Sequence, residues 1–270
     1  LVKGEVRWAP GALGDFVISR SDGSPTFLLA VAVDDLLMEI THVIRGDDLL
    51  ASAPRNAVLI EALGGTPPEY AHVPQVNGQD GKPLSKRHGS TSLEAFREQG
   101  FLPEALMNYL VLLGWSKDAE TTFLSRDEFV GAFDLDRVSV NPAAFDTQKL
   151  EWMNGEHIRA LDPAELVAAV LPFAVERYGT RLDIARFERA VGLARERATT
   201  LVEIAEQMEF LFTADADLEI DPASRERLER SEHSRAVLDA VIDYVAAVEW
   251  SDEIDLRPTI EGLGLKPGKV

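Results

Sequence analysis

The sequence contains no cysteine among its 270 residues, which excludes both a disulfide framework and a thiolate metal site. Long apolar runs are also absent, because the run at residues 27–33 falls far short of the roughly 20 residues that span a bilayer. We therefore predict no membrane partner. No two histidines have the spacing of a metal pair, so we predict no metal-binding residues. The five histidines are His42, His72, His88, His157 and His233.

Basic residues are scarce, with 27 Lys and Arg against 46 Asp and Glu and a formal net charge of −19. This deficit argues against nonspecific binding of nucleic acid, because phosphates are bound by Lys and Arg. The charge is uneven, however. Residues 51–100 hold five basic and five acidic groups, residues 201–250 hold four and thirteen, and five arginines lie from Arg181 to Arg197. A polyanion could therefore bind locally while the rest of the surface repels it.

The first 80 residues have an α/β pattern. The apolar run at residues 26–33 is either a buried strand or a buried helix, which periodicity cannot separate. Ser52, with Pro54 close behind it, predicts the N-cap of a helix that ends at Gly64 and Gly65. Strand, polar loop, helix and strand in this order are typical of a βαβ unit. The predicted strands are residues 15–20, 40–44 and 70–76.

After residue 80 the pattern changes to helices, and capping motifs mark where several of them begin. Residues 91–94 and 125–128 each have the sequence of a capping box, and a helix that begins at Pro103 ends at Gly114. Further helices are predicted to start at Asp162, Thr200 and Asp221, with a last amphipathic helix over residues 235–250.

The most cationic loop, residues 81–90, has the sequence Gly-Lys-Pro-Leu-Ser-Lys-Arg-His-Gly-Ser. Lys82, Lys86, Arg87 and His88 lie within seven residues, and the flanking glycines allow the loop to move. Cationic groups that close over a polyphosphate neutralise the charge that develops in phosphoryl or nucleotidyl transfer. The alternative interpretation is a solvated surface loop with a chance cluster of charge.

Within this loop, PLSKR at residues 83–87 resembles the KMSKS signature of class I aminoacyl-tRNA synthetases, which in the glutamyl-tRNA synthetases is usually KLSKR. Residues 20–48 resemble the second half of that family's catalytic domain. Residues 100–116 and 145–159 resemble its stem-contact region. The resemblance is in order along nearly the whole chain. Pro83 departs from the family, since it stands where a lysine is usual.

The resemblance implies three domains. Residues 1–80 would hold the tail of an acceptor-end domain and the second half of a Rossmann catalytic domain. Residues 81–161 would form the signature loop and a mostly α-helical stem-contact domain, and residues 162–270 a helical anticodon-binding domain truncated at its C-terminus. The HIGH signature does not occur, and Leu1 opens the chain without an initiator methionine. We therefore interpret the chain as a catalytically incomplete fragment.

In the glutamyl-tRNA synthetases, glutamate and ATP give glutamyl-adenylate and pyrophosphate, and the glutamyl group then passes to the 3′ end of tRNA-Glu. The resemblance implies glutamate, ATP with Mg²⁺, and tRNA-Glu as partners. Lys86 matches the second lysine of the signature, which steadies the phosphates, and is the predicted catalytic residue. The predicted ATP-binding residues are Leu84, Ser85, Lys86, Arg87 and Asp48.

By the same resemblance, Arg45 binds the side-chain carboxylate of glutamate, which suits the two-pronged geometry of a guanidinium group. The alternative is a structural ion pair of Arg45 with Asp47 or Asp48. Phe27 and Val31 match other positions of the glutamate pocket, but neither offers the polar group that some members have there.

Arg197 matches a family residue that reads the anticodon, and Arg195 is the second candidate. The alternative is that the two arginines form surface ion pairs with Glu196 and Glu203. The resemblance also implies a monomer in the cytoplasm. Two other functions compete, a stand-alone tRNA-binding protein derived from a synthetase and a glutaminyl-type enzyme, although the helices after residue 161 disfavour the second. A tRNA-modifying paralogue without an anticodon domain is excluded by those helices.

Overall fold

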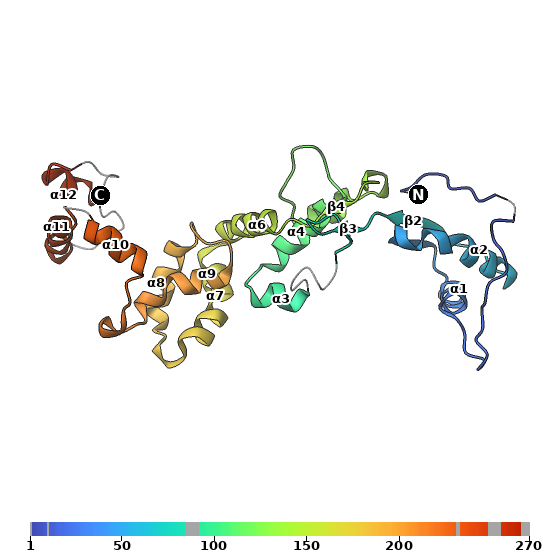
Figure 1. Ribbon diagram of the computed structural model, residues 1–270, viewed down its shortest axis with the longest axis horizontal. Helices are drawn as coiled ribbons and strands as arrows, with labels where there is room; N and C mark the ends of the chain where they lie inside the picture. The colour runs from blue at the N-terminus through green and yellow to red at the C-terminus, as the bar shows by residue number, and fades with distance from the viewer. Residues whose placement is uncertain (1, 10, 85–91, 231–232, 248–254, 266–270) are drawn as a thin grey trace. The chain divides into compact units, whose positions relative to one another are not determined.

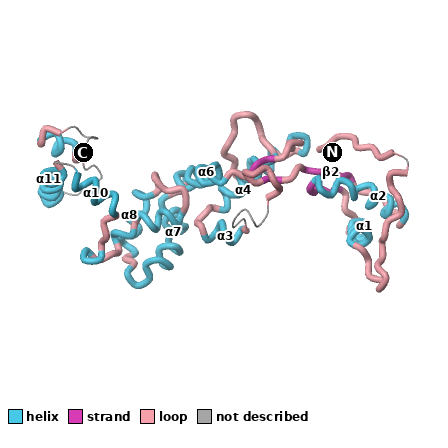
Figure 2. Tube along the Cα trace, in the orientation of Figure 1, coloured by secondary structure: helices cyan, strands magenta, loops and turns pink. Residues whose placement is uncertain are grey.

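The computed structural model describes residues 2–9, 11–84, 92–230, 233–247 and 255–265, and helices predominate in it (Figures 1 and 2). The chain divides into two compact units, Leu1–Phe212 and Thr213–Val270. Within the first unit, an α/β region over residues 11–80 precedes a helical region over residues 92–212.

The α/β region contains the predicted βαβ unit. Strand β1 (His42–Gly46) is followed by the 3₁₀ helix η1 (Asp47–Ser52), helix α2 (Ala53–Ala62) and strand β2 (Glu69–Val73). The two strands are parallel, with Arg45 opposite His72. This parallel pairing requires the crossover that α2 provides, so the predicted order of elements is confirmed.

The ambiguous apolar run is a helix, α1 (Phe27–Leu37). It packs against α2, where Ala32, Leu59 and Ile60 are buried and Leu28 and Leu36 pack around them. Leu28, Ala32 and Leu36 are spaced four residues apart and therefore share one face of the helix. Packing against α2 thus decides between strand and helix.

One strand predicted for the α/β region is wrong. Residues 15–20 form no strand but a loop with one bridge, between Ser19 and Pro25, because no neighbouring strand lies beside them in the described part of the chain. Ser52 occupies the N-cap of α2, as predicted, although its side chain makes no capping hydrogen bond. Its hydroxyl instead donates to the Leu49 carbonyl at 2.7 Å.

The first half of the helical region consists of α3 (Leu93–Glu98), α4 (Pro103–Gly114), α5 (Arg126–Ala132), η3 (Leu135–Arg137) and α6 (Thr147–Ala160). The capping box at residues 125–128 is confirmed, as is the helix from Pro103. The N-cap of α3 is Ser92, which accepts a hydrogen bond from the Ala95 N–H, and Thr91 lies outside the described residues.

The strand predicted over residues 70–76 is interrupted after Val73. A separate short strand, β3 (Val76–Asn77), pairs in parallel with β4 (Ala143–Ala144). Val76 of β3 packs against a core that is rich in aromatic side chains. Its buried members are Phe96, Phe101, Leu106, Tyr109, Phe145, Leu150 and Met153.

The second half of the helical region has a larger core, formed by α7 (Pro163–Tyr178), α8 (Ile184–Ala194) and α9 (Leu201–Gln207) with the 3₁₀ helices η4 (Gly179–Arg181) and η5 (Glu209–Leu211). Helix α7 begins at Pro163, as predicted. The Glu165 carboxylate accepts a hydrogen bond from the Asp162 N–H at 3.2 Å, and Thr200 caps α9. Helix α6 links the two cores, because Leu150 and Met153 belong to the first and Ile158 to the second.

The second unit contains η6 (Asp215–Asp217), α10 (Pro222–Arg230), α11 (Ser234–Ala247) and α12 (Arg257–Gly262). Asp221 accepts a hydrogen bond from the Ser224 N–H at 2.9 Å, which confirms the predicted start of α10. Helix α11 covers residues 235–247 of the last predicted helix. Residues 248–250 lie outside the described residues.

Candidate functional site

Arg45 lies on β1 among uncharged partners. Its Nε–H donates to His72 Nε2 at 3.2 Å, and its Nη2 donates to the Leu49 carbonyl and to Ser52 Oγ at 3.2 and 3.3 Å. Its guanidinium carbon also lies 5.3 Å from the centre of the Tyr70 ring. These contacts orient the guanidinium group without neutralising it, which leaves its charge available to an anion.

The alternative interpretation, an ion pair of Arg45 with Asp47 or Asp48, is wrong for the described residues. Asp47 pairs with Lys3, with 3.0 Å between Nζ and Oδ2. Asp48 is exposed, and its carboxylate folds back over the backbone at Gly46, where an added Cβ would lie 2.4 Å from Asp48 Oδ1. Gly46 therefore provides the space that the Asp48 side chain occupies.

Burial, with the adjacent Arg45 charge, holds the pKa of His72 below its usual value. The neutral imidazole can accept the hydrogen bond from Arg45, and its proton then lies on Nδ1. Asp35 is a further titratable group affected by Arg45. Burial raises the pKa of Asp35, and the charge of Arg45 opposes that shift. Asp35 Oδ2 has no hydrogen-bond partner among the described residues.

Phe27 and Val31 share one face of α1 with Asp35, because the three positions are four residues apart. Phe27 is 67% exposed, and Val31 is partly buried. The charge of Arg45 influences the pKa of Asp35, which lies near the C-terminal end of this face of α1. Val31 and Phe27 lie about one and two helical turns before Asp35. The partners Asp35, Tyr70 and His72 were missed in the sequence, where only the β-branched and aromatic character of β2 was apparent.

The base of the cationic loop is anchored on both sides. The Leu84 N–H donates to the Val76 carbonyl at 2.8 Å, and the Leu84 side chain packs against the aromatic core. On the far side, Ser92 caps α3. Lys82 is exposed, and its Nζ lies 3.9 Å from Asp80 Oδ2. Ser85, Lys86, Arg87 and His88 lie outside the described residues.

Arg195 and Arg197 differ in their surroundings. Arg195 Nε lies 3.6 Å from Glu196 Oε1, so the predicted surface ion pair is confirmed for this residue. Arg197 makes no ion pair among the described residues. Its exposed side chain lines a hollow of about 480 Å³. Glu203, the predicted alternative partner of Arg197, accepts hydrogen bonds from Thr199 instead.

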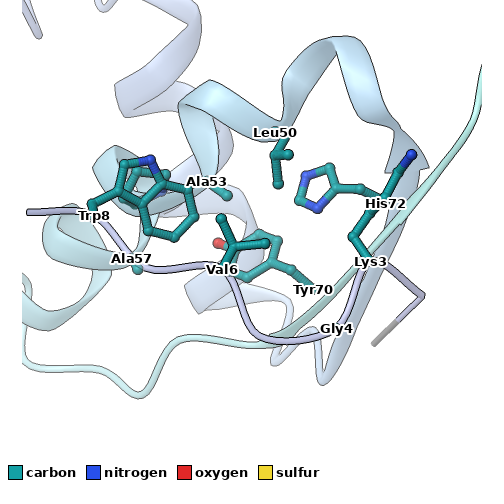
Figure 3. A pocket seen from close by; sticks show the side chains of 10 residues that line it. Lys3, Gly4, Val6, Trp8, Leu50, Ala53, Ala57, Tyr70 and His72 are labelled. Atoms are coloured by element: carbon teal, nitrogen blue, oxygen red, sulfur yellow. The ribbon is translucent and has the colours of Figure 1, made fainter.

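A cavity of about 200 Å³ lies between the N-terminal segment and η1–α2 (Figure 3). Its walls include Val6, Trp8, Leu50, Tyr70 and His72, and it is mostly apolar. None of the site residues predicted from the sequence lines this cavity. Among the described residues no group of three or more His, Cys, Asp or Glu side chains is arranged to hold a metal ion. No described helix has the length and apolar character to cross a membrane.

Comparison with known proteins identifies the class. The family profile described as "tRNA synthetases class I (E and Q), catalytic domain" matches residues 1–152, and the profile described as "Anticodon binding domain" matches residues 165–270. The chain therefore belongs to the class I tRNA synthetase family, and the predicted fold class is confirmed: part of the catalytic domain followed by a helical anticodon-binding domain.

Similar curated proteins and solved structures are named as glutamate–tRNA ligases. The chain is 41% identical to the glutamate–tRNA ligase of Nitrosomonas europaea over 98% of this chain and 57% of that protein. It is 43% identical to glutamate–tRNA ligase 1 of Beijerinckia indica, over 100% of this chain and 59% of that protein. A crystal structure of a glutamate tRNA ligase from Elizabethkingia meningosepticum in complex with its amino acid matches with a TM-score of 0.78 and 29% identity, over 96% of this chain and 55% of that one. The chain thus spans a little over half the length of these relatives.

Proposed function

We propose that the chain is part of a glutamate–tRNA ligase. Such an enzyme forms glutamyl-adenylate and pyrophosphate from glutamate and ATP, and then transfers the glutamyl group to tRNA-Glu with release of AMP. The observation that carries the proposal is Arg45, a half-buried guanidinium group whose hydrogen-bond partners among the described residues are all uncharged. The identity of 41–43% to glutamate–tRNA ligases over nearly the whole chain supports it.

In this proposal Arg45 binds the side-chain carboxylate of glutamate. The held guanidinium fork offers two parallel donors, which a carboxylate accepts and an uncharged amide does not match. Phe27 and Val31, on the adjacent face of α1, contact the aliphatic part of the substrate through their apolar side chains. Because His72 is kept neutral, it does not compete with Arg45 for the anion.

Lys86 is the proposed catalytic residue, and it stabilises the negative charge on the phosphates during adenylation. Leu84, Ser85, Arg87 and Asp48 are the further proposed ATP-binding residues. Mg²⁺ would arrive with ATP and offset the charge of its phosphates. A single exposed carboxylate at Asp48 fits an ion that keeps most of its ligands from phosphate and water.

The proposed tRNA contacts lie in the helical region, with Arg197 and Arg195 as the anticodon-reading residues. We propose the domain division 1–80, 81–161 and 162–270, a monomer as the working state, and the cytoplasm as its location, as expected for a protein of translation. We expect the chain alone to bind tRNA without forming adenylate, since no HIGH signature occurs in it.

Binding of this chain to tRNA-Glu over a series of salt concentrations tests the proposal. We expect affinity to fall as salt rises, because phosphate contacts release counterions, and to fall again when the anticodon is altered. Equal and weak binding of both tRNAs at low salt would contradict the proposed recognition of tRNA-Glu by this chain. Glutamate-dependent ATP–pyrophosphate exchange, measured on the same preparation, tests the expectation that the chain alone makes no adenylate.

A further inference from the structure

Arg45 and His72 lie opposite each other on the paired parallel strands β1 and β2. Side chains of residues paired in this way point to the same face of the sheet. The pairing therefore brings the two side chains together, and the Arg45 Nε–H donates to His72 Nε2 at 3.2 Å. The register of the two strands, rather than a loop, sets this contact.

The imidazole ring of His72 is itself held in place. Its side chain is buried, with 4% of the residue exposed, and its ring stacks on that of Tyr70 with 6.1 Å between the ring centres and an angle of 14°. Tyr70 is two residues earlier on the same strand, so both rings are on one face of β2. Because the Arg45 guanidinium carbon also lies 5.3 Å from the centre of the Tyr70 ring, Tyr70 contacts both partners of the hydrogen bond.

The three hydrogen bonds of the Arg45 guanidinium group are not equivalent. The Leu49 carbonyl and Ser52 Oγ both accept from Nη2, and only His72 accepts from Nε. Nη1 donates to none of the described residues, so it is the end of the group that an anion can reach. Without His72, both remaining hydrogen bonds would hold the same nitrogen, and the planar group could pivot about it. His72 thus fixes the direction in which Nη1 points.

The hydrogen bond requires a neutral imidazole ring. A guanidinium N–H only donates, so His72 Nε2 must keep its lone pair and the proton of the ring lies on Nδ1. Burial, followed by the charge of Arg45, lowers the pKa of His72, which favours this form. The other face of the surroundings is the mostly apolar cavity of Figure 3, whose walls contain no acidic residue that would stabilise an imidazolium ion. The ionisable side chains that contact or influence His72 are Lys3, Arg45, Asp47, Asp48 and Tyr70.

We propose that His72 is a positioning residue of the glutamate site: it holds the Arg45 guanidinium group in the orientation that binds the substrate carboxylate, and it releases that hold when it is protonated. The inference rests on the proposed function, and it adds a residue and a pH dependence to that site. An imidazolium ion would set one N–H against another and place a second positive charge beside Arg45. The affinity for glutamate should therefore fall as the pH falls through the pKa of His72 in the folded protein.

The test compares two substitutions in a full-length protein that carries this chain. His72→Gln offers an amide oxygen in place of Nε2 and does not titrate, whereas His72→Phe keeps a buried ring beside Tyr70 without an acceptor. In glutamate-dependent ATP–pyrophosphate exchange at pH 7.5, we expect the KM for glutamate to rise about tenfold for His72→Phe and to stay within about twofold for His72→Gln. The maximal rate and the KM for ATP should change little, because the lost contact acts on glutamate binding. Between pH 7.5 and 5.5 the KM for glutamate should rise in the unaltered protein and stay constant in His72→Gln.

The outcomes separate this inference from the proposed function. If Arg45→Gln raises the KM for glutamate while His72→Phe leaves it unchanged, His72 does not position Arg45 and the proposed function stands. If His72→Phe raises the KM for glutamate and for ATP alike, the role of His72 is structural and the inference is wrong. If the unaltered full-length protein shows no exchange that depends on glutamate, the proposed function and the inference are both overturned.

A second measurement needs no substrate and uses this chain alone. Long-range ¹H–¹⁵N NMR spectra of the chain with ¹⁵N-labelled histidine report which ring nitrogen carries the proton, and the signals that His72→Gln lacks belong to His72. We expect a neutral ring protonated on Nδ1 at pH 7.5, which becomes doubly protonated over the pH range in which the KM for glutamate rises. A neutral ring with its proton on Nε2 could not accept from Arg45 and would overturn the inference.

Discussion

The α/β region and the helical region differ in whether their buried polar atoms have hydrogen-bond partners. In the α/β region, Asp35 Oδ2, Arg55 Nε and Asn56 Oδ1 are buried without a hydrogen-bond partner among the described residues. In the helical region, Asn108 and Asn154 are buried and both side chains are hydrogen-bonded to backbone groups. Asn108 bonds to Thr122 and Leu124, and Asn154 joins Leu102 to Thr199. A buried polar atom without a partner costs about 1–3 kcal/mol.

The two regions also differ in the size of their hydrophobic cores and in what their polar groups contact. The hydrophobic core of the α/β region has three buried residues, Ala32, Leu59 and Ile60, whereas the helical region has two larger cores joined by α6. In the α/β region, the polar groups of His72, Leu49 and Ser52 hold the Arg45 guanidinium group. The helical region uses its own to hold helices together. Substitutions should therefore change substrate use in the first region and stability in the second.

The largest effect is expected from Lys86→Ala in a full-length protein that carries this chain. Removing a group that stabilises transition-state charge commonly costs about 3–4 kcal/mol, or at least about a hundredfold in rate. The rate of glutamate-dependent ATP–pyrophosphate exchange measures this loss. Lys82→Ala is the matched control, because Lys82 is an exposed lysine of the same loop beside Asp80. A similar loss in both variants would contradict a specific role for Lys86.

Asn154→Ala should be the most destabilising substitution in the helical region. It leaves the Leu102 N–H and the Thr199 carbonyl without their partner, the fully buried Asn154 side chain. At about 1–3 kcal/mol for each group, we expect a loss of about 2–6 kcal/mol in the free energy of unfolding. Urea denaturation followed by circular dichroism measures it. Asn141→Ala, in an exposed loop, is the control and should change stability by less than about 0.5 kcal/mol.

Arg45→Gln should affect the substrate more than the fold. The variant keeps a polar side chain of similar length but loses the charge that binds a carboxylate. A charge-assisted hydrogen bond contributes about 1.5–3 kcal/mol, so the KM for glutamate should rise by at least about tenfold. Steady-state exchange kinetics in the full-length protein test this, with the exposed Arg20→Gln as control. An unchanged KM in Arg45→Gln would remove Arg45 from the glutamate site.

Two glycines with the same backbone conformation allow a direct comparison of the regions. Gly100 has φ +81° and Gly64 has φ +86°, but an added Cβ at Gly100 would lie 2.7 Å from the Val202 nitrogen, whereas nothing lies within 4 Å at Gly64. Gly64→Ala should cost about 1–2 kcal/mol through its left-handed backbone alone. Gly100→Ala should cost more than that, because the backbone of α9 must move. If urea denaturation shows that both variants lose the same free energy of unfolding, the packing of Gly100 against α9 does not contribute to stability.

The smallest effect is a pH dependence of stability. Burial lowers the pKa of His157, with Glu104 opposing the shift, and its Nε2 lies 3.1 Å from Asn108 Oδ1. Below about pH 6.5 the unfolded chain then binds more protons than the folded one, so stability falls on acidification. In the α/β region, burial and the charge of Arg45 lower the pKa of His72, so His72 also makes stability fall on acidification. Asp35 has the opposite sign, because its raised pKa adds stability that is lost as the pH rises through it.

Urea midpoints at pH 7.5 and 5.5 measure this dependence. His157→Gln stays neutral at both values, so the helical region of this variant should lose part of the acid sensitivity seen in the unaltered chain. An identical pH dependence in the two proteins would show that His157 is protonated equally in the folded and unfolded states.

Local sequence signals were reliable wherever neighbouring residues decide the structure. The capping box at Ser125, the helix from Pro103 to Gly114 and the start of α10 at Asp221 were predicted correctly, since each depends on a hydrogen bond or a φ preference within four residues. The strand predicted at residues 15–20 was wrong for the converse reason. A strand requires a partner, and β propensity alone does not supply one.

The candidate site could be predicted only in part. Arg45 and the cationic loop were apparent from their chemistry and from the family resemblance. The hydrogen bond from Arg45 to His72 joins residues 27 positions apart, and the burial that keeps His72 neutral exists only in the folded chain. The exposure of Leu193 and Phe210 was equally hidden, because an apolar residue in a helical pattern is expected to face the core.

The sequence by itself determined the family, the order of the βαβ unit and the helices, and the concentration of positive charge in one loop, because these depend on residue identity and short-range spacing. The tertiary structure decided that residues 27–37 form a helix, that Arg45 makes no ion pair with the acidic residues that the structure describes, and that Arg197 and Phe210 share one hollow. These features depend on which distant segments pack together. Packing is governed by the burial of apolar surface and the satisfaction of polar groups over the whole fold.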